Sequence, residues 1–175
     1  MDECTAKRRG DAVKIKGIID EDFVNYKKPS MVVQFPKCSF KCDKACKKQV
    51  CQNSALAAAP AVEISVFDLI NRYLSSPITK AIVLAGLEPF DSIEDVFLIL
   101  NHMRFNGHND DIVIYTGYTE EEMEDFQQLF NMYDNLIIKY GRFIPEQKPH
   151  YDELLGIHLA SNNQYAKGYG INGKS

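Results

Sequence analysis

Residues 81–103 read AIVLAGLEPFDSIEDVFLILNHM and predict a buried strand, a short turn and an amphipathic helix. Residues 81–84 form an apolar run of strand length. After the turn, Ser92 begins a pattern in which apolar side chains recur every three or four positions, as on one face of a helix. These side chains are Ile93, Val96, Phe97, Leu100 and Met103. A strand followed by a helix is the repeating unit of parallel α/β sheets.

The same unit recurs on both sides of this stretch. Further apolar runs of strand length occupy residues 31–35, 112–115 and 136–140. Further helical patterns begin at Ser65 and Thr119, and each predicted helix start has an acidic residue three positions on, as in helix capping boxes. Repeated strand–helix units predict a parallel sheet with right-handed crossovers. Ligands of such sheets bind at the carboxyl ends of the strands, so the four segments that follow the strands should share one rim.

Length and charge narrow the classes of function. The 175 residues fit one domain, predicted over residues 15–175 after a leader at residues 1–14. A net charge of −4 gives no support for a general nucleic-acid-binding role. The chain has no apolar run of the roughly 20 residues that span a membrane, and its first residues are polar rather than typical of a signal peptide. We therefore expect a cytoplasmic protein without nucleic-acid or membrane partners.

Four of the five cysteines fall on the segment after the first strand, at Cys38, Cys42, Cys46 and Cys51. A reducing cytosol does not maintain structural disulfides, so clustered thiols there indicate metal binding or catalysis. Thiolates are the usual ligands of iron–sulfur clusters, and a tetrahedral zinc site with four cysteines is the alternative. Five lysines surround the thiols, either as a solvated face or as a docking patch for an acidic, flavodoxin-like electron donor; they are Lys37, Lys41, Lys44, Lys47 and Lys48.

Polar groups also follow the later strands. Gly86 permits close approach of a ligand to the backbone, Glu88 could accept hydrogen bonds from an amino group, and Pro89 fixes the turn. Thr116, Gly117 and Tyr118 offer a hydroxyl, a bare backbone and an aromatic face. Asn163 and Gln164 could complete a polar pocket with their amides. Taken singly, each of these segments is equally consistent with an ordinary turn or cap.

In combination, these segments resemble the radical S-adenosylmethionine (SAM) family, and within it the activating proteins of anaerobic ribonucleotide reductase. The matching segments, in chain order, are Cys38-x-x-x-Cys42, Cys51-Gln52-Asn53, Gly86-Leu87-Glu88-Pro89, Tyr115-Thr116-Gly117-Tyr118-Thr119, Gly141-Arg142-Phe143 and Ser161-x-Asn163-Gln164. The family's usual Cys-x3-Cys-x2-Cys motif is not kept, because no cysteine lies three positions after Cys42. The third ligand is either Cys46 or Cys51, and Cys51 brings Asn53 into register with the family's closing Cys-x-Asn.

The resemblance implies an open, partial β/α barrel of radical SAM type. It implies a [4Fe–4S] cluster held by Cys38, Cys42 and Cys51, with Cys46 as the alternative third ligand. SAM would bind at Gly86, Glu88, Pro89, Thr116, Gly117, Tyr118, Asn163 and Gln164. The implied reaction is reductive cleavage of SAM to a 5′-deoxyadenosyl radical, which generates a glycyl radical on a partner, first of all the large subunit of anaerobic ribonucleotide reductase. A zinc-binding module and an electron-transfer iron–sulfur protein without SAM chemistry are the competing hypotheses.

Overall fold

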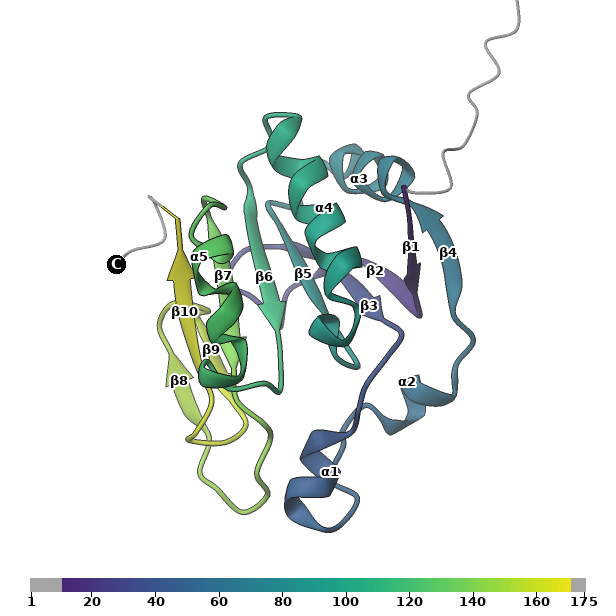
Figure 1. Ribbon diagram of the computed structural model, residues 1–175. Helices are drawn as coiled ribbons and strands as arrows, with labels where there is room; N and C mark the ends of the chain where they lie inside the picture. The colour runs from purple at the N-terminus through teal and green to yellow at the C-terminus, as the bar shows by residue number, and fades with distance from the viewer. Residues whose placement is uncertain (1–10, 171–175) are drawn as a thin grey trace, which may run out of the picture.

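A six-stranded sheet forms the centre of the protein, for which a computed structural model describes residues 11–170 (Figure 1). The strand order is β10-β7-β6-β5-β3-β2. The four inner strands run parallel to one another; they are β3 (Ser30–Phe35), β5 (Ala81–Gly86), β6 (Asp111–Tyr115) and β7 (Leu136–Tyr140). These are the four strands predicted from the apolar runs, so the prediction of a parallel sheet is confirmed for the interior.

The two edge strands are antiparallel to their neighbours and were not predicted. β2 (Gly17–Asp22) pairs with β3, and β10 (Tyr165–Tyr169) pairs with β7. β2 ends in three acidic residues and β10 contains a lysine and a glycine, so neither has the apolar run of an inner strand. The chain is therefore a mixed α/β protein with a mixed sheet, and the partial barrel of radical SAM type stays a prediction.

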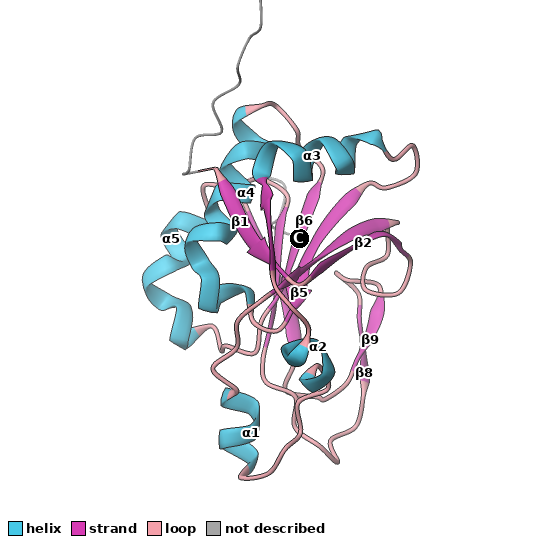
Figure 2. Cartoon of the chain, turned by 90° about the vertical axis from the view of Figure 1, so that its right-hand side faces the viewer, coloured by secondary structure: helices cyan, strands magenta, loops and turns pink. Residues whose placement is uncertain are grey.

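Helices cover one face of this sheet (Figures 1 and 2). They are α3 (Val66–Ser75), α4 (Ile93–Phe105), the 3-10 helix η2 (Glu121–Phe126) and α5 (Gln127–Phe130). Because side chains alternate along a strand, every second residue faces the helices. Leu84, Ile114 and Ile138 lie in the core beneath the helices, whereas their neighbours Val83, Val113 and Ile137 belong to a second core on the other face.

The three predicted helix caps have different outcomes. The Ser65 hydroxyl accepts a hydrogen bond from the Asp68 N–H at 3.0 Å, as expected. Thr119 and Glu122 form the reciprocal pair of a capping box, with distances of 2.9 and 3.3 Å, but the helix that follows is 3-10. The cap at Ser92 was wrong, because its buried hydroxyl has no partner among the described residues. A 3-10 turn, η1 (Pro89–Ser92), precedes α4, and the Glu88 carboxylate caps that turn.

A hairpin covers part of the other face of the sheet. β8 (His150–Asp152) pairs with β9 (Ile157–Leu159), and Figure 2 shows the hairpin on the side opposite α4 and α5. Leu155, in its turn, packs with Tyr26 in the second core. The hairpin leaves this face of the sheet, opposite the helices, partly uncovered near the carboxyl ends of the strands, where the candidate site lies.

Ordered structure begins earlier than the predicted leader allows. β1 (Ala12–Ile15) pairs with β4 (Val62–Ser65), and Val13 and Ile15 are buried, so residues 12–14 belong to the folded domain. The rest of the predicted leader up to residue 10, with Cys4, lies outside the described residues. Among the described helices, none is long and apolar enough to cross a membrane. Two short helices, α1 (Lys41–Cys46) and α2 (Ser54–Ala58), complete the fold.

Candidate metal and ligand site

A cavity of about 440 Å³ lies at the carboxyl ends of the parallel strands. Its wall is formed by the cysteine segment, by the turns after β5 and β6, by β7 and by the hairpin. In Figure 1, α1 lies at the end of the sheet towards which the parallel strands point. The four segments predicted to share one rim therefore do so, as the strand–helix topology requires.

Three of the four clustered cysteines line this cavity. They are Cys38, Cys42 and Cys51, whereas Cys46 is not part of the described wall. Cys38 follows β3 and Cys42 lies in α1. The chain then reverses after Lys47, whose left-handed backbone ends α1, and returns Cys51 to the side of Cys42. This return explains how a cysteine separated from Cys42 by eight residues, instead of the usual two, reaches the same cavity.

Asp43 fixes the returning segment. Its Oδ1 atom accepts hydrogen bonds from the Val50 and Cys51 backbone N–H groups, both at 2.8 Å. Asp43 directly follows Cys42 in the chain, so its carboxylate links the backbone next to Cys42 to the backbone of Cys51. Asp43 could not be singled out beforehand, because its role depends on a chain reversal that no local pattern predicts.

Three further contacts hold the cysteine segment against the sheet. Asp91 accepts from the Ser39 N–H with one oxygen and from the Tyr118 hydroxyl, at 2.6 Å, with the other. The Lys41 ammonium lies 3.8 Å from the centre of the Tyr118 ring. Asn53 donates from its side chain to the Gly86 carbonyl at 2.7 Å. The segment is thereby attached to the turns after both β5 and β6.

The buried thiols suit metal binding. Burial raises the pKa of Cys38 to about 11, against a backbone hydrogen bond from Phe40 that lowers it. Burial likewise raises the pKa of Cys42, while the Phe143 N–H and Arg142 favour its thiolate. Without metal these thiols are therefore neutral, and metal binding must release their protons. Backbone N–H groups directed at the sulfurs would stabilise the thiolates that result.

The donor set fits a cluster better than a single ion. Within residues 11–170, no three His, Cys, Asp or Glu side chains lie close enough to hold one metal ion. Zinc ligands at a bond length of about 2.3 Å would place their sulfurs about 3.8 Å apart. Cysteine ligands of a [4Fe–4S] cluster each bind a different iron and stand further apart. Three thiols spread over the wall of one cavity suit the second arrangement.

Glu88 connects the turns that follow β5 and β6. Its Oε1 atom accepts from the Thr116 hydroxyl at 2.8 Å and from the Phe90 N–H at 3.1 Å, and its Oε2 atom accepts from the Gly117 N–H at 2.8 Å. Burial raises the pKa of Glu88 to about 7, although these three donors favour its ionised form. A Cβ atom built on Gly117 would lie 3.5 Å from both Cys42 Sγ and Glu88 Oε2. The thiol and the carboxylate therefore meet at Gly117.

Gly86 is required by close approach of the backbone. Its φ angle is 96°, and a Cβ atom there would lie 2.8 Å from the Phe35 nitrogen. Side chains are strained at such a φ angle, so the position favours glycine. The glycine lets the end of β5 pass directly beside the end of β3, which leads into the cysteine segment.

Five of the eight residues predicted to bind SAM line the cavity, namely Gly86, Glu88, Thr116, Gly117 and Gln164. The other three are not part of the described wall. Pro89 begins the η1 turn, Tyr118 binds Asp91, and Asn163 donates to the Arg142 carbonyl at 2.8 Å.

Lys139 is a cavity residue that sequence reasoning missed. It lies on β7, is 6% exposed, and donates from Nζ to the Gly141 carbonyl at 2.9 Å. Burial lowers its pKa to about 8. A signal was present, because a lysine inside the apolar run of residues 136–140 is unusual for a strand buried on both faces.

Comparison with known proteins gives one match. A family model described as a 4Fe-4S single cluster domain matches residues 30–165. The matched range begins with β3 and extends to β10, so it includes the cysteine segment and every turn around the cavity. No curated protein and no solved structure matches the chain.

Proposed function

Because the chain belongs to the family of 4Fe-4S single cluster domains, we propose that Cys38, Cys42 and Cys51 hold its cluster and that SAM binds beside it. The observation that carries this proposal is the shared cavity. Three thiols line it together with the Glu88 carboxylate, and Cys42 and Glu88 both approach Gly117. A cluster with three cysteine ligands leaves one iron free to bind a ligand, which an electron-transfer protein with four cysteine ligands does not offer.

The choice of Cys51 as third ligand rests on two contacts. Asp43 draws the backbone of Cys51 towards α1, and Asn53 ties the following turn to Gly86. Cys46 lies on the same helix as Cys42 but is not part of the described cavity wall. The folded loop of eight residues between Cys42 and Cys51 would then replace the two-residue spacing that is usual in the radical SAM family.

The residues around the cavity have separate proposed roles. When bound, the cluster and SAM would supply a 5′-deoxyadenosyl radical after transfer of one electron. Glu88 is held by three donors and, in its ionised form, would accept hydrogen bonds from the amino group of SAM. Gly86 and Gly117 would let SAM approach the backbone closely, and the Gln164 amide would add polar contacts. Partial burial of these groups would limit the access of water and so strengthen the polar contacts to SAM.

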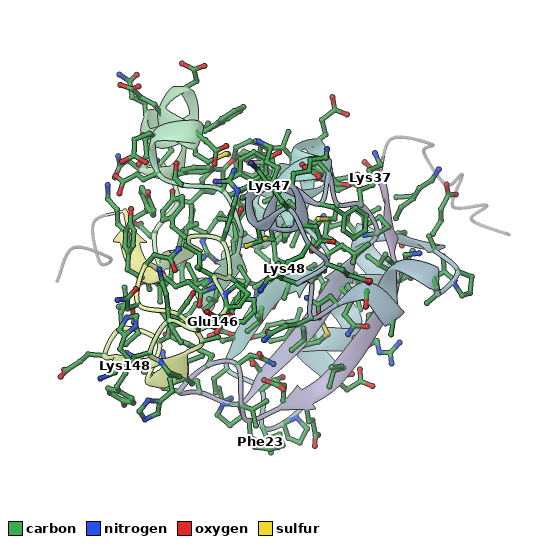
Figure 3. The ribbon with its side chains drawn as sticks, turned by 90° about the horizontal axis from the view of Figure 1, so that it is seen from below. Phe23, Lys37, Lys47, Lys48, Glu146 and Lys148 are labelled. Carbon is green, nitrogen blue, oxygen red and sulfur yellow. The ribbon has the colours of Figure 1, made fainter. Side chains whose placement is uncertain are left out.

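We further propose that the radical abstracts hydrogen from a glycine Cα of a partner enzyme, with the large subunit of anaerobic ribonucleotide reductase as first candidate. An exposed apolar lip supports a protein partner. Val24 lines the cavity although it is 72% exposed, and its neighbour Phe23 is 62% exposed. Figure 3 looks onto this end of the molecule and shows Phe23 at one side of the view and Lys47 and Lys48 nearer its middle. The exposed lysines suit an acidic electron donor such as a flavodoxin-like protein.

Anaerobic reconstitution followed by reduction tests the proposal. Iron and sulfide should approach four of each per chain, and the reduced protein should convert SAM to methionine and 5′-deoxyadenosine. Addition of a candidate reductase subunit should then give the doublet signal of a glycyl radical in electron paramagnetic resonance. A colourless protein with one zinc would support the structural-module hypothesis instead. A cluster that leaves SAM intact would indicate electron transfer.

A further inference from the structure

Lys139 presents a buried ammonium group that forms no ion pair with another residue of the described part of the chain. An ammonium group has three N–H donors, and the Gly141 carbonyl accepts one of them. None of the ion pairs within residues 11–170 involves Lys139. A buried charge without a partner is costly, and an apolar side chain of similar size would fit the strand at lower cost. We therefore expect a negatively charged group of a bound ligand to compensate the charge of Lys139 in the cavity.

The position of Lys139 identifies the charge that it could bind. Lys139 lies beside Tyr115 on the face of the sheet opposite the helices, with Nζ 5.9 Å from the centre of the Tyr115 ring. In the described cavity wall, Lys139 provides the ammonium group and Glu88 the carboxylate. Burial lowers the pKa of Lys139, and the ionised forms of Glu88 and Cys42 would raise it, so Lys139 lies within electrostatic reach of both ends of the candidate site. The cavity thus offers one group of each sign, as an amino acid zwitterion requires.

We propose that the Lys139 ammonium binds the carboxylate at the amino-acid end of the ligand and so selects a ligand that carries a free α-carboxylate. The inference rests on the proposed function, because it takes SAM as that ligand. The two remaining N–H donors of Lys139 can form charge-assisted hydrogen bonds to a carboxylate, and these are the stronger kind. Lys139 would be a specificity-determining residue that makes direct contact with the ligand.

A second source of negative charge lies near Lys139, namely the cluster and its thiolates. A lysine that only offsets the charge of the cluster would change the reduction potential but would not distinguish ligands with and without a carboxylate. The experiment must therefore compare two ligands that differ in that group alone. Decarboxylated SAM keeps the amino group, the sulfonium and the adenosine.

Equilibrium dialysis with the anaerobically reconstituted, oxidised protein measures both affinities. We expect Lys139→Met to weaken SAM binding by about 10- to 100-fold, the range for loss of a hydrogen bond between charged groups. The affinity for decarboxylated SAM should stay within about twofold of wild type, since that ligand has no carboxylate to lose. Lys139→Arg should retain most of the preference for SAM. Lys139→Gln serves as a second neutral variant if the methionine variant does not fold.

The outcomes separate the inference from the proposed function. A wild type that binds neither ligand overturns both. A wild type that binds SAM, with neutral variants that keep the full preference over decarboxylated SAM, overturns the role of Lys139 alone. Equal weakening of both ligands, or a shift of the cluster's midpoint potential with unchanged preference, overturns it as well. Iron content of each variant, measured before dialysis, shows that the cluster is present in every comparison.

Discussion

Replacing Asp43 with alanine should release Cys51 from the cavity and weaken the hold on the cluster. The Asp43 carboxylate accepts two backbone hydrogen bonds, each of 2.8 Å, from Val50 and Cys51. Hydrogen bonds to charged groups contribute about 1.5–3 kcal/mol each, and partial exposure of Asp43 reduces this to about 1 kcal/mol each. Loss of both costs about 2 kcal/mol, which corresponds to about a 30-fold shift away from the closed loop.

Two further variants serve as controls for the expected size of this effect. Asp43→Asn keeps an oxygen acceptor without the charge, so about half of the free energy, or about fivefold, should be lost. Asp125→Ala removes an exposed carboxylate far along the chain from the cysteine segment and should behave as wild type.

Loss of iron to a chelator under anaerobic conditions is a suitable assay, because it reports on the ligand loop without requiring SAM chemistry. The rate should increase from wild type to Asp43→Asn to Asp43→Ala. If the alanine variant loses iron as slowly as Asp125→Ala, the Asp43 contacts do not position a cluster ligand, and the reasoning from loop geometry to ligand identity is refuted.

Two further predictions concern the cavity wall. Gly86→Ala should lower the free energy of unfolding by about 1–3 kcal/mol, because its φ angle is strained for a side chain and a Cβ atom would lie 2.8 Å from the Phe35 nitrogen. Chemical denaturation measures this loss, with Gly107→Ala as the control, since Gly107 has a similar φ angle but open space around it. Equal losses in the two variants would rule out the close contact as the cause. SAM affinity should rise with pH through about 7, as Glu88 ionises, and fall above about 8, as Lys139 loses its proton. Dialysis between pH 6 and 9.5 measures both changes in affinity. A fall above pH 8 that persists in Lys139→Arg would contradict its assignment to Lys139.

The interior of the fold followed from local sequence patterns. The apolar runs that became β3, β5, β6 and β7 are nearly uninterrupted, which is typical of strands buried on both faces. The parallel topology then brings the turns after these strands to one rim. That is why Glu88 and Thr116 could be expected at the same place before any contact was known. The edge strands β2 and β10 were missed because an edge strand needs only one apolar face and tolerates charge.

The details of the site depended on long-range contacts that the sequence does not encode locally. The reach of Cys51 into the cavity depends on Asp43 and on the chain reversal after Lys47. The cap predicted at Ser92 failed because the 3-10 turn η1, which Glu88 caps, leads directly into α4. Lys139 was passed over because periodicity identifies its strand but not which face borders a cavity.

The identity of the three cluster ligands and the open fourth position are tested most directly by electron paramagnetic resonance of the reduced protein, with and without SAM. We expect wild type and Cys46→Ala to give the same [4Fe–4S] signal and the same change on addition of SAM, whereas Cys51→Ala should not assemble an intact cluster. A signal that survives in Cys51→Ala but is lost in Cys46→Ala, or a wild-type signal that SAM leaves unchanged, would contradict a cluster bound by Cys38, Cys42 and Cys51 beside a SAM site.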